Sequence, residues 1–311
     1  MIDTLGVHDS VDAVFPPAVL RESLADDHPD LTARVVETAA GVADCDALVT
    51  FAHDPAVFDA DLRWVHSIQA GVDRFPLETF EARGVALTNS TGIHGDAVGE
   101  AALGTMLMLA RRLHVYRSNQ ERGEWARPAW DEPFTLRGES LCVVGLGTLG
   151  RGIATRADAL GMRVSGVKRT PTPVDGVETV HPSSALLEAV SDARFVALAV
   201  PLTDRTEGLV GEQALARMRE DAYLVNVARG GVVDQSALVR ALDEGGIAGA
   251  ALDVFETEPL PPESPLWERE EVIVTPHAAA ATDEYYERVA ALVRENLRRL
   301  AAGETLANRV A

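Results

Sequence analysis

The feature that most constrains the fold of this 311-residue chain is a glycine-rich turn directly after a short apolar segment. Leu141-Cys142-Val143-Val144 predicts a buried strand, and Gly145-Leu146-Gly147-Thr148-Leu149-Gly150 leads into a helical stretch at 151–160. In this setting Gly145 permits the tight turn, Gly147 lets the backbone approach a pyrophosphate, and Gly150 allows close helix–strand packing. The helix N-terminus attracts phosphate charge. We therefore predict a dinucleotide site in which these glycines, Thr148 and Leu149 bind the cofactor; the alternative is a glycine-rich turn without a ligand.

The rest of the chain alternates short apolar strands with helical stretches, which predicts an α/β fold with mainly parallel sheets. The expected strands are residues 47–52, 64–68, 85–88, 141–144, 163–167, 195–200, 223–227, 250–254 and 272–275. The expected helices include residues 96–120, 234–244 (capped by Asp234) and a charged amphipathic helix at 282–302 that starts at Thr282. The length suits two domains, and the last helix is expected to pack back on the first.

Charge and composition exclude several classes of partner. The formal net charge of −20 argues against nucleic acid and against anionic membrane surfaces. Lys168 is the only lysine among 28 basic residues. A strongly acidic chain with almost no lysine favours adaptation to high salt, where the repulsion between carboxylates is screened. The alternative is an acidic protein from a GC-rich genome, which favours arginine over lysine. No export signal or membrane-spanning run is evident, so we expect a cytoplasmic protein. Cys45 and Cys142 are expected to be reduced, and no Cys/His spacing predicts a metal site.

The strand after the glycine turn ends in an unusual basic segment. A fold that binds NAD normally places an acid here, about 20 residues after the turn, to bind the ribose hydroxyls. This chain has Lys168-Arg169-Thr170 instead. A lysine and an arginine attract a 2′-phosphate that a carboxylate would repel, so these three residues predict a preference for NADP(H) over NAD(H). The alternative is a solvated basic pair.

Three polar side chains follow later strands of the same sheet, where ligands bind in such folds. They are Arg229, Glu258 and His277, and each alone could be an ordinary surface or strand-end residue. Together with the glycine turn they match a known set of motifs. On these motifs the chain resembles the D-2-hydroxyacid dehydrogenase family over nearly its full length. The segments that carry the resemblance are Gly145 to Gly150, Asn226-Val227-Ala228-Arg229-Gly230, Leu252-Asp253-Val254-Phe255, Glu258-Pro259-Leu260, Thr275-Pro276-His277, Gln69-Ala70-Gly71-Val72-Asp73 and Thr88-Asn89-Ser90 through Glu100.

The resemblance implies an enzyme that interconverts 2-keto acids and D-2-hydroxy acids by hydride transfer. Arg229 would hold the substrate carboxylate, and His277 would act as acid/base. Glu258 would hold the orientation of the imidazole and favour its protonated form. The backbone amides of Ala70, Gly71 and Val72 would complete the carboxylate site. Further cofactor contacts are expected from Val200, Pro201, Thr206, Val227 and Asp253, although Asp253 could equally be a strand-end acid satisfied by the backbone.

The family also implies two doubly wound parallel-sheet domains with a cleft between them. Residues 1–97 plus 283–311 would bind substrate, and residues 98–282 would form the larger Rossmann domain. A homodimer is expected, with the helix from Asp96 at its interface. The alternatives are a nucleotide-sensing corepressor and a purely cofactor-binding protein; a formate-oxidising relative is disfavoured because no glutamine lies near His277. His53 and His94 are interpreted as solvated histidines, and Trp267 as either a pocket-closing or a packing residue.

Overall fold

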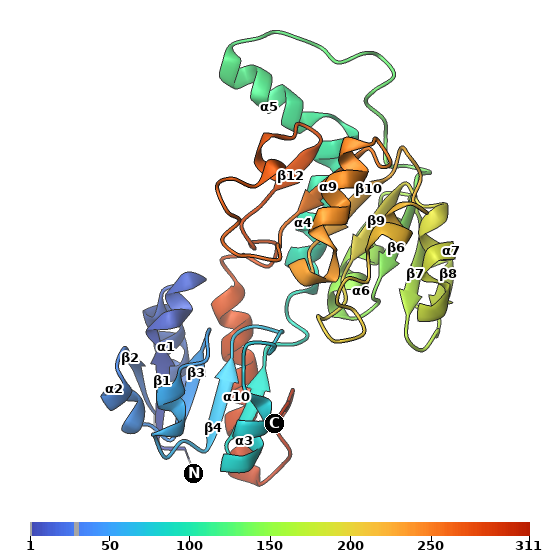
Figure 1. Ribbon diagram of the computed structural model, residues 1–311. Helices are drawn as coiled ribbons and strands as arrows, with labels where there is room; N and C mark the ends of the chain where they lie inside the picture. The colour runs from blue at the N-terminus through green and yellow to red at the C-terminus, as the bar shows by residue number, and fades with distance from the viewer. Residues whose placement is uncertain (1, 28–30) are drawn as a thin grey trace. The chain divides into compact units, whose positions relative to one another are not determined.

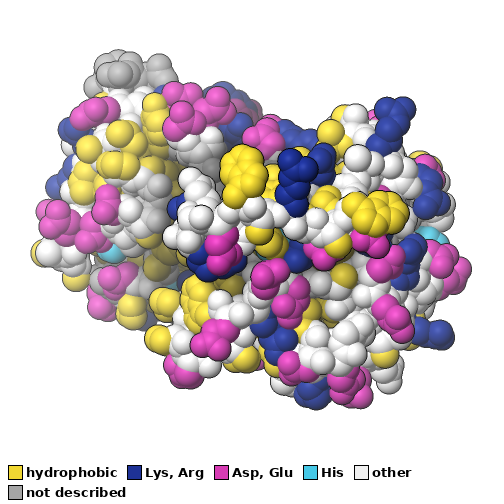
Figure 2. Space-filling view, turned by 90° about the horizontal axis from the view of Figure 1, so that it is seen from above, with side chains coloured by type: hydrophobic (Ala, Val, Ile, Leu, Met, Phe, Trp, Pro, Cys, Tyr) yellow, Lys and Arg dark blue, Asp and Glu magenta, His cyan; other side chains and the backbone are white. Residues whose placement is uncertain are grey.

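A computed structural model describes residues 2–27 and 31–311 and divides them into two compact units (Figure 1). The first comprises the described residues up to Ile93 together with Ala281–Ala311, and the second is His94–Ala280. The boundaries expected from the sequence lay at 97/98 and 282/283. Acidic and basic side chains are interspersed on the face shown in Figure 2, with hydrophobic side chains exposed between them.

The first unit contains a five-stranded parallel sheet in the order β2-β1-β3-β4-β5. Its strands are β1 (Thr4–His8), β2 (Thr32–Val36), β3 (Ala47–Thr50), β4 (Trp64–Ser67) and β5 (Ala86–Asn89). Its helices are η1 (Asp9–Ala13), α1 (Pro17–Asp27), α2 (Ala39–Ala43), η2 (Pro55–Phe58), α3 (Leu77–Arg83) and α10 (Tyr285–Ala302). The last helix packs on this unit, where the Tyr285 hydroxyl donates to the Ile68 carbonyl at 2.8 Å.

The second unit contains a seven-stranded parallel sheet in the order β12-β11-β10-β9-β6-β7-β8. Its strands are β6 (Ser140–Val144), β7 (Arg163–Lys168), β8 (Thr179–Pro182), β9 (Phe195–Leu198), β10 (Tyr223–Asn226), β11 (Gly249–Leu252) and β12 (Val272–Val274). Its helices are α4 (Gly95–Ala110), α5 (Leu113–Arg122), α6 (Thr148–Ala159), η3 (Ser183–Ala185), α7 (Leu186–Ser191), α8 (Glu212–Leu215), η4 (Gly230–Val232), α9 (Gln235–Asp243) and η5 (Pro265–Glu268). The strand order reverses between β6 and β9, where doubly wound sheets bind ligands. The predicted fold class is confirmed.

Both faces of this sheet are covered, which explains why its central strands are continuous apolar runs. Along β6, Cys142 and Val144 belong to one core, whereas Leu141 and Val143 belong to the core on the opposite face. Burial raises the pKa of the Cys142 thiol to about 12, so this cysteine is an inert packing residue.

Helices α4 and α6 approach each other through glycines. A Cβ on Gly152 would lie 1.9 Å from the carbonyl oxygen of Gly95, and one on Gly99 would lie 2.6 Å from that of Gly152. Neither position has room for a side chain. This contact fixes α6, the helix that follows the glycine turn, against α4.

Several sequence-based expectations were wrong in detail. The helix expected at residues 96–120 is broken at Arg112, whose φ is 55°. Two contacts stabilise the break. The Ala110 carbonyl accepts from the Phe134 amide at 2.9 Å, and the Arg112 guanidinium pairs with Glu270 at 2.8 Å. The last helix begins at Tyr285 instead of Thr282, since Glu284 is the N-cap. Strands β1, β2 and β8 were not predicted. Asp234 does cap α9, accepting from the Ala237 amide at 2.9 Å.

Candidate active site

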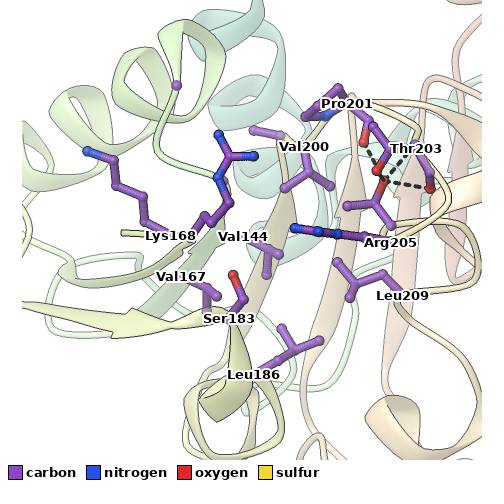
Figure 3. Close-up of a pocket in the computed structure, with 15 residues that line it drawn as sticks. Val144, Val167, Lys168, Ser183, Leu186, Val200, Pro201, Thr203, Arg205 and Leu209 are labelled. Carbon is purple, nitrogen blue, oxygen red and sulfur yellow. Dashed lines mark hydrogen bonds between the residues drawn. The ribbon is translucent and has the colours of Figure 1, made fainter. Parts of the chain in front are cut away.

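A cavity of about 440 Å³ lies at the carboxyl ends of β6, β7 and β9 in the second unit (Figure 3). Its lining combines aliphatic side chains with a basic rim. The lining residues are Val144, Gly145, Gly147, Val167, Lys168, Arg169, Ser183, Leu186, Ala199, Val200, Pro201, Thr203, Arg205, Thr206 and Leu209. Seven of these residues were predicted from the sequence to contact the cofactor. The other eight were not: Val144, Val167, Ser183, Leu186, Ala199, Thr203, Arg205 and Leu209.

The glycine turn has the geometry that a pyrophosphate requires. Gly145 has φ of 99° and donates to the Val167 carbonyl at 2.9 Å, so the chain turns sharply at the end of β6. A Cβ on Gly150 would lie 1.7 Å from the Gly145 carbonyl oxygen. Gly147 differs, because nothing lies within 4 Å of a Cβ built there. Gly145 and Gly150 are therefore required by the turn and by close packing. Gly147 instead leaves open space beside the N-terminus of α6, where a phosphate fits.

The other predicted residues of the turn and of the basic segment have distinct surroundings. Leu149 is partly buried and packs against the core, so its side chain serves the fold. Lys168 donates from Nζ to the Thr172 hydroxyl at 2.9 Å, and Arg169 also lines the cavity. Thr170 is exposed and does not line it. The lining includes three basic side chains and no carboxylate, although the chain carries 48 acidic residues.

His277 and Glu258 form a hydrogen-bonded pair. His277 Nδ1 lies 2.9 Å from Glu258 Oε2, and Glu258 Oε1 accepts from the Phe255 amide at 3.2 Å. His277 adopts φ of 53°, a left-handed conformation that non-glycine residues seldom take and that is often found at functional sites. The imidazole is 39% exposed, so it remains accessible to a ligand. The pairing leaves Nε2 as the ring nitrogen that can exchange a proton with a substrate.

Asp253 stabilises the segment that carries His277. Its Oδ1 accepts from the Thr275 hydroxyl at 2.6 Å and the Ala278 amide at 2.8 Å, and its Oδ2 accepts from the Ala279 amide at 2.9 Å. The His277 amide also donates to the Asp253 carbonyl at 2.7 Å. The side chain is buried, and these three bonds leave one of about four acceptor positions of the carboxylate available.

Arg229 follows β10 on a turn that side chains and close packing hold in place. The Asn226 amide group donates to the Arg229 carbonyl at 3.0 Å and accepts from the Ala228 amide at 3.1 Å. A Cβ on Gly230 would lie 1.8 Å from the Phe255 carbonyl carbon, so the Arg229 turn packs directly on the segment that leads to Glu258. Arg229 Nη1 donates to the Ala228 carbonyl at 2.7 Å.

A second cavity, of about 280 Å³, lies between α4 and the ends of β10, β11 and β12. Its lining includes Val227 and Asp253, two of the predicted cofactor contacts, together with Thr275 and Ala278 beside His277. The structure therefore places these two predicted residues at one cavity within the second unit.

The remaining predicted residues lie elsewhere. Ala70, Gly71 and Val72 belong to the first unit, where the Ala70 carbonyl accepts from Asn89 Nδ2 at 2.6 Å; their substrate contact stays a prediction. Thr206 lines the first cavity, but its hydroxyl is engaged within its own turn, donating to the Pro201 carbonyl at 2.6 Å.

The interpretation of His53 and His94 as solvated side chains was wrong. His53 packs among the rings of Phe58, Phe75 and Phe80, and burial lowers its pKa. His94 is buried at the start of α4. The phenylalanine neighbours of His53 come from positions that the local sequence did not indicate.

The described residues contain no cluster of three or more His, Cys, Asp or Glu side chains that could hold a metal ion. Within residues 2–27 and 31–311, none of the helices combines the length and apolar character needed to cross a membrane. Trp267 is half-exposed, and its indole nitrogen donates to the Pro261 carbonyl at 2.9 Å.

Comparison with known proteins identifies the family. Residues 103–279 match the family model described as D-isomer specific 2-hydroxyacid dehydrogenase, NAD binding domain. The chain belongs to this family. It is 40% identical over 282 residues to a glyoxylate reductase of Korarchaeum cryptofilum, covering 86% of this chain and 83% of the relative.

Solved structures of the same family share the fold of this dehydrogenase. A D-isomer specific 2-hydroxyacid dehydrogenase from Xanthobacter autotrophicus, in complex with NADPH and MES, superposes with a TM-score of 0.86 at 32% identity, covering 100% of this chain and 98% of the other. An NADPH-dependent glyoxylate/hydroxypyruvate reductase from Sinorhizobium meliloti, in complex with NADP and sulfate, gives 0.84 at 26% identity, covering 99% and 98%.

Proposed function

We propose that this dehydrogenase reduces small 2-keto acids to D-2-hydroxy acids with NADP(H), and that His277 is the acid/base. The observation that carries the proposal is the His277–Glu258 pair at 2.9 Å, held at the end of the sheet that also carries the glycine turn. Relatives named glyoxylate reductase and glyoxylate/hydroxypyruvate reductase support the proposal. They suggest glyoxylate and hydroxypyruvate as the first substrates to test.

His277 moves the proton. The Glu258 carboxylate accepts from Nδ1–H, which fixes the ring orientation and directs Nε2 toward the substrate. Nε2–H then donates its proton to the carbonyl oxygen at C2 during reduction, and the deprotonated Nε2 takes the proton from the hydroxyl during oxidation. When bound, the nicotinamide cofactor supplies or accepts the hydride at C2. Glu258 thus acts through His277 and is a positioning residue.

Arg229 binds the substrate. Its guanidinium presents a planar fork of donors that matches a carboxylate and the adjacent carbonyl oxygen of a 2-keto acid. The Asn226 bonds and the tight packing of Gly230 fix the turn that presents it. The backbone amides of Ala70, Gly71 and Val72 would supply further donors to the carboxylate.

The cofactor would extend along the carboxyl ends of β6 to β12. Gly145, Gly147, Thr148, Leu149 and Gly150 would form the pyrophosphate turn. Val200 and Pro201 would border the adenine, and Thr206 would lie near the phosphates or the nicotinamide ribose. Val227 and Asp253 would contact the nicotinamide half, where the remaining acceptor position of Asp253 suits a carboxamide N–H.

The basic rim supports a preference for NADP(H). Lys168 and Arg169 line the cavity at the end of β7, and no carboxylate lines it. Charge-assisted hydrogen bonds from these side chains, with Thr170 beside them, would bind a 2′-phosphate. NAD(H) lacks that phosphate and would bind in the same cavity more weakly.

The test is a steady-state panel of glyoxylate, hydroxypyruvate and branched 2-keto acids with NADPH and NADH. Product chirality is analysed for hydroxypyruvate and the branched 2-keto acids, because the glycolate formed from glyoxylate is achiral. The proposal expects D-hydroxy acid products and a higher kcat/KM with NADPH. A higher kcat/KM with NADH would refute the cofactor assignment. NADPH binding without turnover of any keto acid would instead favour a nucleotide-sensing corepressor-like protein.

We also propose that the protein is a homodimer in which α4 and the segment after α5 contact the second copy. Figure 1 shows α5 and this segment extending from the sheet of the second unit. Trp125 and Trp130 in this segment are 97% and 92% exposed, and Leu107 on α4 is 38% exposed. Large exposed apolar side chains of this kind mark association surfaces. Light scattering that gives a monomer mass at micromolar concentration would refute the dimer.

A further inference from the structure

Arg205 lies on a turn after β9 and reaches into the cavity at the ends of β6, β7 and β9 (Figure 3). The turn is held by its own hydrogen bonds. The Thr206 hydroxyl accepts from the Thr203 amide at 2.8 Å and donates to the Pro201 carbonyl at 2.6 Å, and the Thr206 amide donates to the Thr203 carbonyl at 2.8 Å. The backbone that presents Arg205 is therefore fixed before any ligand binds.

The guanidinium of Arg205 is not engaged by the protein. Asp204 precedes it and Glu207 follows two residues later, yet Arg205 forms no hydrogen bond or ion pair with the residues that the structure describes. In Figure 3 its side chain extends toward the aliphatic residues Val144 and Val200. A guanidinium is planar and weakly hydrated, so it can pack on a flat aromatic ring as well as bind an anion.

The strand order indicates whether Arg205 packs on an aromatic ring or binds an anion. The glycine turn follows β6, and β6 lies between β7 and β9 in the sheet. Lys168 and Arg169 come from the β7 side, where the 2′-phosphate is expected, whereas Arg205 comes from the β9 side. The space between the two sides is walled by aliphatic side chains, which suits a base better than a phosphate.

We propose that Arg205 packs its guanidinium against the adenine ring of the bound cofactor and so contributes to affinity for NADPH and NADH alike. This inference rests on the proposed function only in requiring that the cavity hold the adenosine half of a dinucleotide. Lys168 and Arg169 discriminate between the two cofactors, whereas Arg205 binds the part that both share. A cation–aromatic contact of this kind corresponds to a roughly threefold to thirtyfold change in Kd.

The test is calorimetric or fluorescence titration of the purified full chain with NADPH and NADH, without substrate. Arg205→Ala is expected to raise both Kd values by a similar factor and leave their ratio unchanged. Arg205→Lys keeps the charge but not the planar group, so it should recover only part of the lost affinity and should do so equally for both cofactors. Arg217→Ala removes an exposed arginine outside the cavity and is the matched control, expected to bind like the wild type.

Other outcomes overturn the inference. A loss confined to NADPH, rescued by Arg205→Lys, would show that Arg205 binds the 2′-phosphate. Unchanged Kd values for both cofactors would show that it binds neither group. If the wild type prefers NADH, the proposed cofactor preference fails, but the NADH titration still decides the role of Arg205.

Discussion

Substituting Gly147 and Gly150 separately by alanine should distinguish ligand binding from folding within one turn. A Cβ at position 150 would lie 1.7 Å from the Gly145 carbonyl oxygen, so the backbone must separate by more than an ångström. Overpacking of this severity costs about 3 kcal/mol or more. We expect Gly150→Ala to melt about 6–12 °C below the wild type, given about 2–4 °C per kcal/mol for a unit of this size.

Gly147→Ala should leave the fold intact. Gly147 has φ of −79° and ψ of −156°, which alanine adopts without strain, and nothing lies within 4 Å of the new Cβ. Alanine is a poorer N-cap than glycine by about 0.5–1 kcal/mol, but it gains about 0.4–1 kcal/mol by restricting the unfolded chain. The two effects nearly cancel. The methyl group would, however, occupy the space expected for the pyrophosphate.

Thermal unfolding by circular dichroism and titration with NADPH measure the two effects independently. Gly147→Ala should melt within about 2 °C of the wild type and bind NADPH at least about tenfold more weakly. If Gly147→Ala binds NADPH as tightly as the wild type, the pyrophosphate does not lie against this turn. If Gly150→Ala melts like the wild type, the packing argument is wrong.

Three further predictions address the residues around the site and a buried histidine. Glu258→Gln replaces the carboxylate that pairs with His277 Nδ1 and should lower kcat while leaving the Kd for NADPH near the wild-type value; an unchanged kcat would contradict this pairing. Asp253→Asn places an amide N–H against the Ala279 amide, so it should lower the free energy of unfolding by about 1–3 kcal/mol and also lower kcat. Thr275→Val removes only one hydrogen bond to Asp253, so it should have a smaller effect on both quantities. Burial lowers the pKa of His66 to about 3, so the unfolded chain binds a proton below about pH 6.5 that the folded chain does not, and stability should fall as pH decreases through this range. His66→Gln should lose stability less steeply between pH 6.5 and 5 in urea unfolding, and an equal slope would argue against a neutral buried ring.

The sheets and the glycine turn could be predicted because strictly local patterns specify them. A strand buried on both faces is a continuous apolar run, and Leu141 to Val144 has no other plausible structure. β2 escaped notice because only Val36 of its five residues is buried, so it carries little hydrophobic signal. The helix break at Arg112 depends on Phe134 and Glu270, residues distant in sequence.

The candidate site shows the same limit. The family resemblance indicated His277 and Glu258 as partners. The three hydrogen bonds that Asp253 accepts from Thr275, Ala278 and Ala279 were not predicted, because they depend on how the chain folds after β12. Arg205 escaped attention because its role depends on the direction of one side chain on a turn. Side-chain direction at a loop is set by tertiary contacts, which the local sequence does not contain.

The acid/base role of His277 is the central claim, and turnover of glyoxylate by His277→Ala tests it most directly. NADPH oxidation followed by absorbance, alongside an NADPH titration, separates proton transfer from cofactor binding. The account predicts that kcat falls by several orders of magnitude while the Kd for NADPH stays near the wild-type value, because the imidazole delivers the proton and does not bind the adenosine half. Turnover close to that of the wild type would contradict it.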